Sequence, residues 1–234
     1  MIYLENVSKS FNNKWAVKGI TFNVEKGEVF GLLGPNAAGK TTTIKMMTGL
    51  LRPTDGKILI HGYDIVKEPL QAKTIFGYVP DKAFLYEKLK GREFLIFVAS
   101  IHGIEKSVAI KRIDELFERF GIKEIEEELI ESYSQGMKQR ILFLSALIHN
   151  PDVLIIDEPF VGLDPFGIIL LKETIHRLSS EGVTVFLATH SLHIAEELCR
   201  RIGIIREGSL VCIKKREEII SEGGLQKLFL QTTS

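Results

Sequence analysis

A glycine-rich turn between an apolar segment and a helix-forming segment constrains this chain more than any other feature. The turn occupies residues 34–43 and reads GPNAAGKTTT, which contains the spacing G-x-x-x-x-G-K-T. Glycine allows the backbone to turn tightly and to come close to a ligand. Loops of this spacing wrap their N–H groups around phosphates, and the positive end of the following helix adds to the attraction. The sequence therefore predicts a site for the phosphates of a nucleotide.

Two side chains of this loop have predicted roles. Lys40 is expected to reach the β- and γ-phosphates, and the Thr41 hydroxyl is expected to bind Mg²⁺. A buried strand at 28–33 and a helix at 41–50 should flank the loop, and these flanks argue against a chance glycine-rich turn. The expected nucleotide-binding loop consists of Gly34, Pro35, Asn36, Ala37, Ala38, Gly39, Lys40, Thr41 and Thr42.

An apolar run that ends in two acids is the second chemical feature. Residues 153–156 read VLII, and Asp157 and Glu158 follow directly. Ligands of open α/β sheets lie beyond the carboxyl ends of the strands. Asp157 is therefore expected to hold Mg²⁺ or its water, and Glu158 to polarise a water for in-line attack on the γ-phosphate. Taken alone, a strand that meets solvent with two acids is the simpler interpretation, but the phosphate loop favours the chemical one.

The order of apolar patterns predicts the fold class. Strand-like and helix-like segments alternate, which is typical of a mainly parallel sheet covered on both faces, and the first strands suggest an additional antiparallel portion. Residues 93–149 are mostly helical in pattern. We expect one α/β domain at 1–234, with a core at 1–85 and 150–234 and an inserted helical subdomain at about 86–149. The other expected strands are 1–7, 16–24, 57–61, 76–79, 183–188, 202–205 and 209–213. The other expected helices are 64–74, broken or starting late at Pro69, 141–149, 166–179 and a helix capped by Ser191 with Leu192, Ala195, Leu198 and Ile202 on one face.

The charge balance and the apolar runs of the sequence limit the kinds of partner that the protein can have. Lys and Arg together number 30, as do Asp and Glu, so bulk charge gives no argument for nucleic acid. The start of the sequence has no pattern of a secretion signal, and the longest apolar runs fall below the roughly 18 residues that span a bilayer. Cys199 and Cys212 have no metal-ligand spacing and form no disulfide framework. We expect a cytoplasmic protein whose partner supplies any membrane-spanning helices.

The order of these motifs resembles the nucleotide-binding subunits of ATP-binding cassette (ABC) transporters over nearly the whole chain. The family's Walker A and Walker B motifs correspond to 34–41 and 153–157. The family signature LSGGQ corresponds to 133–137, which reads YSQGM, and the D-loop to 162–164. His190 stands at the position of the switch histidine. Phe11, expected in a loop, stands where the family places a ring that stacks on adenine, although Trp15 is an alternative.

The resemblance implies a P-loop fold and a Mg²⁺-dependent ATPase that powers transport. Two cassettes, expected here to be a homodimer, would pair head to tail and hold each ATP between the Walker A loop of one copy and Ser134 and Gly136 of the other. Glu158 would be the general base, His190 would contact the γ-phosphate, and Asp164 would link the two sites. An integral-membrane permease would be the other partner and would hold the chain at the inner face of the membrane.

Several residues depart from the family pattern. Ala37 replaces a common glycine, and Gln135 and Met137 replace signature residues, while the serine and second glycine are kept. Asp81 replaces a glutamine that approaches Mg²⁺, so its metal contact is through water or absent, and a solvated turn acid is the alternative. Some exporter-type members carry an acid there, so we expect an exporter. The permease contact is expected around 81–93 and the following helices.

Two other functions were weighed against transport. A soluble ATP-dependent switch built on the same cassette is the first, but translation members of the family usually carry two cassettes and repair members carry long coiled coils. A protein that binds nucleotide without hydrolysing it is the second. The retention of Lys40, Asp157, Glu158 and His190 argues against it.

Overall fold

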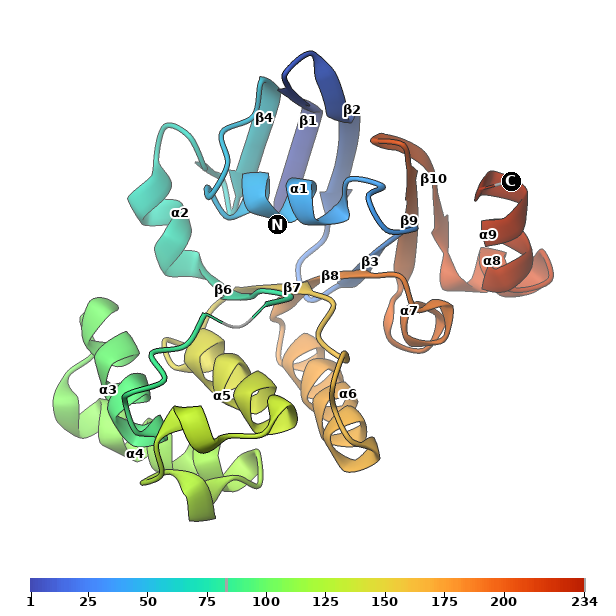
Figure 1. Ribbon diagram of the computed structural model, residues 1–234. Helices are drawn as coiled ribbons and strands as arrows, with labels where there is room; N and C mark the ends of the chain where they lie inside the picture. Colours follow the sequence, from blue (N-terminus) through green and yellow to red (C-terminus); the bar gives the residue numbers. More distant parts are fainter. Residues whose placement is uncertain (83, 234) are drawn as a thin grey trace.

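The computed structural model describes residues 1–82 and 84–233, so Ala83 and Ser234 of the predicted domain lie outside the described residues. Figure 1 shows two sheets with helices packed around them. The first part of the chain forms β1 (Ile2–Phe11), β2 (Lys14–Val24), β3 (Val29–Leu33), α1 (Lys40–Met47), β4 (Asp55–Ile60), β5 (Tyr63–Asp64), α2 (Pro69–Ile75) and β6 (Phe76–Val79). The second part forms α3 (Gly91–Ile101), α4 (Lys106–Arg119), α5 (Gln135–Leu147), β7 (Val153–Asp157), α6 (Pro165–Ser180), β8 (Thr184–Thr189), α7 (Leu192–Leu198), β9 (Arg201–Arg206), β10 (Ser209–Lys215), α8 (Arg216–Ser221) and α9 (Leu225–Thr233).

The central sheet has six strands in the order β10-β9-β3-β8-β7-β6. All neighbouring strands are parallel except β10, which is antiparallel to β9. Every residue of β3, β7 and β8 is buried, as expected where helices cover both faces of a parallel sheet. Figure 1 shows α1 on one face and α5 and α6 on the other. The predicted α/β fold is confirmed, and the carboxyl ends of β3, β7 and β8 meet at one edge.

The first strands form a separate antiparallel sheet in the order β2-β1-β4-β5. In Figure 1 this sheet lies across α1 from the central sheet, so α1 is covered on both sides. Stacked aromatic rings connect the two sheets: the ring of Phe22 on β2 lies 5.2 Å from that of Phe30 on β3 and 5.9 Å from that of Phe186 on β8. Such large apolar side chains contribute most of the burial in a core. The predicted antiparallel portion is therefore present and holds the start of α1 in place.

Helices α3, α4 and α5 occupy the chain between β6 and β7, with short 3₁₀ turns at Lys123–Ile125 and Ile130–Ser132. This agrees with the predicted helical character of the segment, while the subdomain boundaries stay a prediction. Helix α5 lies directly on β6. A Cβ atom at Gly77 would be 2.2 Å from the carbonyl oxygen of Ala146, so only glycine permits this close approach.

The structure corrects several sequence-based expectations. Phe11 is the last residue of β1 and not part of a loop. Helix α5 begins at Gln135, within the signature, because Ser134 caps it there. Helix α2 begins at Pro69, the late start that the sequence had left open, since proline suits a first helical turn and not a helix interior. The two short C-terminal helices α8 and α9 were not predicted. None of the described helices is long and apolar enough to cross a membrane.

Candidate functional site

A cleft of about 320 Å³ lies at the start of α1, at the edge where the parallel strands end. Two loop residues are glycine for steric reasons. A Cβ atom at Gly34 would be 2.4 Å from the Ile205 carbonyl oxygen, and one at Gly39 would be 2.7 Å from that of Ala16. Gly39 also has a φ of 111°, which disfavours other residues. The residues lining the cleft are Ala16, Asn36, Ala37, Ala38, Gly39, Lys40, Thr41, Thr42, Asp81 and Glu158.

Lys40 is the main cation of this cleft. Its side chain is almost fully buried, and its Nζ atom donates hydrogen bonds to the carbonyl oxygens of Gly34 at 2.8 Å and Pro35 at 3.2 Å. The same atom lies 3.5 Å from Oε1 of Glu158. The loop carbonyls thus hold the ammonium group at the floor of the cleft, where it attracts an anion.

Asp157, the last residue of β7, is fully buried, and neither of its carboxylate oxygens has a hydrogen-bond partner among the described residues. The pKa of Asp157 is raised to about 6, mainly by burial and also by the charges of Asp81 and Glu158. Thr41 and Lys40 act in the opposite direction, although no hydrogen bond of good geometry joins Thr41 to the carboxylate. An unpaired buried carboxylate beside a hydroxyl is a donor set that suits Mg²⁺.

No group of three or more His, Cys, Asp and Glu side chains is arranged as a metal cage in the described part of the chain. This agrees with the chemistry of Mg²⁺, which usually takes one or two protein ligands and completes its shell with phosphate oxygens and water. Thr41, Asp157 and Asp81 therefore fit a phosphate-bound Mg²⁺ and not a metal held by protein alone.

Glu158 follows β7 directly and has a strained backbone, with a φ of 47°. Its side chain is 13% exposed, and Oε1 lies 2.9 Å from Nδ1 of His190. The Thr189 hydroxyl, at the end of β8, donates to Oε2 at 3.1 Å. Strained residues persist where the surroundings fix them, and they are enriched at active sites. The neighbouring strands β7 and β8 thus hold a carboxylate and an imidazole together at the cleft.

Asp81 lies in the segment after β6 and lines the cleft. The residue is exposed in a bend, so its place at the cleft fits both the predicted site role and a solvated turn acid, and its contact with Mg²⁺ stays a prediction. Sequence reasoning missed Ala16 and Thr189. The strand pattern before His190 was the one sequence signal that could have placed Thr189 beside Glu158.

The signature and D-loop residues form a second group that does not line the cleft. Ser134 caps α5, and its hydroxyl accepts a hydrogen bond from the Met137 N–H at 3.3 Å. Asp164 caps α6, where Oδ1 accepts from the Gly167 N–H at 2.7 Å and from Arg140 at 3.1 Å. Gly136 is packed near the D-loop, because a Cβ atom there would be 3.7 Å from the Gly162 carbonyl oxygen.

The candidate adenine-stacking rings lie in the β1–β2 hairpin. Phe11 is 47% exposed and Trp15 is 52% exposed, and neither lines the cleft, although the adjacent Ala16 does. The Lys9 Nζ atom lies 5.2 Å from the centroid of the Phe11 ring. Both rings are thus accessible, and the preference for Phe11 stays a prediction.

Comparison with known proteins decides the family. The profile of the ABC transporter family matches residues 17–161. The Linearmycin resistance ATP-binding protein LnrL of Bacillus subtilis (strain 168) is 42% identical over the whole chain, which spans 75% of that protein. The chain belongs to the ABC transporter family. It is an ATP-binding, ATP-hydrolysing subunit of that family, and the sequence-based resemblance is confirmed.

Two further ABC proteins support this assignment. The Bacitracin transport ATP-binding protein BcrA of Bacillus licheniformis is 39% identical, with 90% of this chain and 68% of that protein covered. A solved ATP-binding subunit of an ABC transporter matches with a TM-score of 0.94 and 30% identity, and all of both chains is covered. The ABC cassette fold therefore extends over the complete chain described here.

Proposed function

We propose that this ABC subunit is a Mg²⁺-dependent ATPase that works as a homodimer and powers export through an integral-membrane permease. The observation that carries the proposal is the joint placement of Lys40, Asp81 and Glu158 in one cleft, with the unpaired carboxylate of Asp157 beneath it. In this proposal the chain lies at the cytoplasmic face of the membrane, held there by the permease.

The residues of the cleft divide the chemistry between them. Lys40 and the loop N–H groups bind the β- and γ-phosphates, and Thr41 and Asp157, with Asp81 through water or directly, hold Mg²⁺. When bound, Mg²⁺ neutralises charge on the phosphate oxygens. Glu158 accepts a proton from the attacking water, and His190, 2.9 Å from its Oε1 atom, orients the carboxylate and contacts the γ-phosphate.

A second copy completes the site in this proposal. The chain has one phosphate loop and one signature, and Ser134 and Gly136 do not line the cleft of their own chain. Head-to-tail pairing brings the helix start at Ser134 of one copy to the ATP of the other, where free N–H groups attract phosphate. Asp164, which caps the adjacent helix α6, lies beside the signature and links the two sites.

Export is supported by the names of two relatives, which refer to linearmycin resistance and to bacitracin transport. The acid at position 81 agrees with exporter-type members. We also propose that residues at about 86–149 act as a subdomain, because the chain enters this region once after β6 and leaves it once before β7. The permease would contact the region around 81–93 and the helices that follow.

Replacement of the proposed base tests this function. We expect Glu158→Gln to lower the turnover of ATP by about 100-fold or more, as loss of a general base does, while ATP binding is retained. Glu173→Gln, at an exposed position on α6, is the matched control and should hydrolyse ATP normally. Turnover by Glu158→Gln equal to that of the control would refute the assignment of Glu158.

A further inference from the structure

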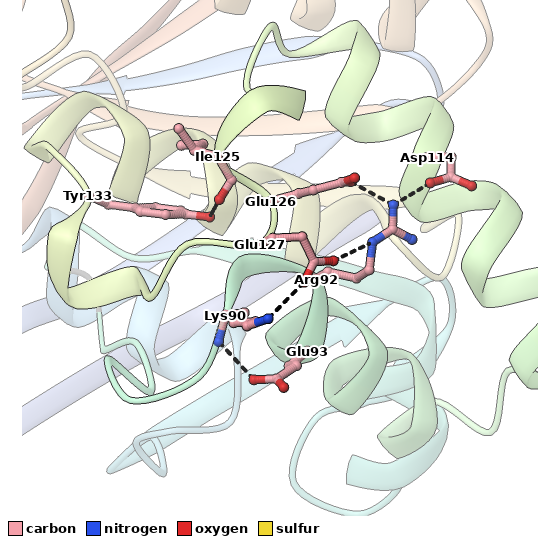
Figure 2. Close-up of polar contacts among 8 residues, drawn as sticks. All are labelled: Lys90, Arg92, Glu93, Asp114, Ile125, Glu126, Glu127 and Tyr133. Atoms are coloured by element: carbon pink, nitrogen blue, oxygen red, sulfur yellow. Dashed lines mark hydrogen bonds and ion pairs between the residues drawn. The ribbon is translucent and has the colours of Figure 1, made fainter.

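Tyr133 occupies the signature position where the family has leucine, and the proposed function gives it no role. Its side chain is buried, and its hydroxyl donates a hydrogen bond to the Ile125 carbonyl oxygen at 2.6 Å, as Figure 2 shows. A Cβ atom at Gly91, the first residue of α3, would be 2.2 Å from this hydroxyl oxygen. Burial raises the pKa of Tyr133 to about 12, so the phenol remains a donor at neutral pH.

The segment that Tyr133 contacts is joined to the start of α3. Arg92 lies between Glu126 and Asp114, at 2.6 and 2.5 Å, and Lys90 reaches Glu127 at 3.0 Å (Figure 2). Arg92 and Glu126 are mostly buried, so this network is less screened than surface ion pairs. Backbone hydrogen bonds connect the same segments, from Gly91 to Glu128, Arg92 to Glu126, Ile130 to Leu89 and Glu131 to Glu87.

Ser134 follows Tyr133 directly and caps α5. On its other side, the Lys138 Nζ atom in the first turns of α5 lies 2.6 Å from Oε1 of Glu87, in the same segment before α3. Tyr133 and Lys138, on either side of Ser134, therefore both contact residues of the segment 87–92. Tyr133, the residue before Ser134, contributes a buried and uncharged hydrogen bond to this arrangement.

We propose that Tyr133 is a positioning residue, whose hydroxyl contact with Ile125 above Gly91 orients Ser134 toward the ATP of the second copy. This inference rests on the proposed function of Ser134. Tyr133 does not touch ATP itself. It acts by holding the chain before Ser134 against the start of α3, so that the hydroxyl of Ser134 is preorganised when the two copies close.

The variant Tyr133→Phe isolates the hydroxyl, because it keeps the ring that fills the space above Gly91. The Ile125 carbonyl oxygen also accepts a hydrogen bond from the Glu128 N–H at 3.0 Å, so the variant leaves no unpaired buried acceptor and should fold. Tyr63→Phe, at an exposed position on β5, is the matched control. Both substitutions remove one phenolic hydroxyl, but only one of them lies beside Ser134.

Dimerisation in the presence of ATP and Mg²⁺ is the measurement that tests the inference. The full chain with Glu158→Gln is used as background, because slow hydrolysis lets the ATP-bound dimer accumulate. In analytical ultracentrifugation we expect Tyr133→Phe to weaken this dimer by about 3- to 10-fold, the effect of one hydrogen bond. The affinity of the monomer for ATP should equal that of the Tyr63→Phe control, and the melting temperature without ATP should fall by no more than loss of one buried hydrogen bond causes.

A Ser134→Gly variant separates the inference from the proposed function, since glycine keeps most of the helix cap but removes the hydroxyl. If Ser134→Gly weakens the dimer and Tyr133→Phe does not, the inference about Tyr133 is overturned and the proposed function stands. If neither variant weakens the dimer, the cross-dimer role of Ser134 fails, and the inference fails with it. A lower melting temperature of Tyr133→Phe together with an unchanged dimer would overturn it, because the hydroxyl would then act through folding alone.

Discussion

Several residues at the cleft lower the stability of the folded chain, and folding alone does not explain their presence. Asp157 is a buried carboxylate without a hydrogen-bond partner among the described residues, and Glu158 has a left-handed backbone conformation. Ala37 shares this conformation, with a φ of 63°, at the position where the family often has glycine. Each feature disfavours the folded chain by about 1–3 kcal/mol. Other non-glycine residues with a positive φ lie away from the cleft, so it is the unpaired carboxylate of Asp157 next to the strained Glu158 that agrees with an active site.

Removal of the buried charge should therefore stabilise the protein. We expect Asp157→Asn to raise the free energy of unfolding at pH 7.5, without nucleotide, by about 1–3 kcal/mol, because an unpaired buried carboxylate is lost. Urea denaturation measures this change. Asp152→Asn, at an exposed position before the same strand, should change stability by less than about 0.5 kcal/mol. A less stable Asp157→Asn variant would show that the carboxylate has a stabilising partner.

At the scale of elements, a histidine pair joins the ends of α3 and α5 to β6. The rings of His102 and His149 stack with centroids 3.9 Å apart, and Nε2 of His149 lies 3.2 Å from the Phe76 carbonyl oxygen. Burial lowers the pKa of His149 to about 4, and the charges of His102 and Arg112 lower it further. The contact between helices and sheet thus depends on a neutral imidazole.

This contact predicts a pH dependence. The pKa of His149 is lower in the folded chain than its ordinary value of 6.5, so the unfolded chain binds more protons between pH 6.5 and 4. Stability should therefore fall as the pH falls through this range. Between pH 7 and 5 we expect the wild type to lose about 1–2 kcal/mol more than His149→Gln, which keeps a hydrogen-bond donor but does not titrate. Urea titrations at pH 7 and pH 5 measure the free energy of unfolding. If the wild type and His149→Gln lost equal amounts, the prediction would be contradicted.

On the scale of the whole molecule, a polar cluster around Arg201 connects the two sheets. Arg201 on β9 binds both carboxylate oxygens of Glu28, at 2.7 and 2.8 Å, and also donates to the Asn23 carbonyl oxygen on β2. The side chain of Glu28 is 1% exposed. The cluster thus fixes the antiparallel sheet, which covers α1, against the central sheet that carries the cleft.

Loss of the Glu28 charge should weaken the whole fold. Glu28→Gln leaves the guanidinium of Arg201 without its counter-charge, and we expect it to lower the free energy of unfolding by about 2–4 kcal/mol. Glu5→Gln, at an exposed position on β1, serves as control and should change it by less than about 0.5 kcal/mol. Thermal and urea unfolding report the difference. A wild-type stability of Glu28→Gln would mean that the charge of Glu28 contributes little to holding the two sheets together.

The sequence by itself determined the features that depend on near neighbours. The spacing of Gly34, Gly39, Lys40 and Thr41 specifies a strand, a phosphate loop and a helix, and the acids after the apolar run specify a strand end. These patterns are local, because a backbone conformation and a buried strand need only adjacent residues. The motifs, their order and the α/β class were therefore predictable, and with them the family.

Only the tertiary structure decided which distant side chains meet. The contacts of Glu158 with Thr189 and His190, of Asp164 with Arg140 and of Tyr133 with Ile125 depend on how strands and helices pack, and no local pattern encodes them. Helix α5 begins at Gln135 and not at the predicted residue 141, because the Ser134 hydroxyl caps it by accepting from the Met137 N–H. Local spacing specifies the chemical groups, whereas long-range packing fixes their distances.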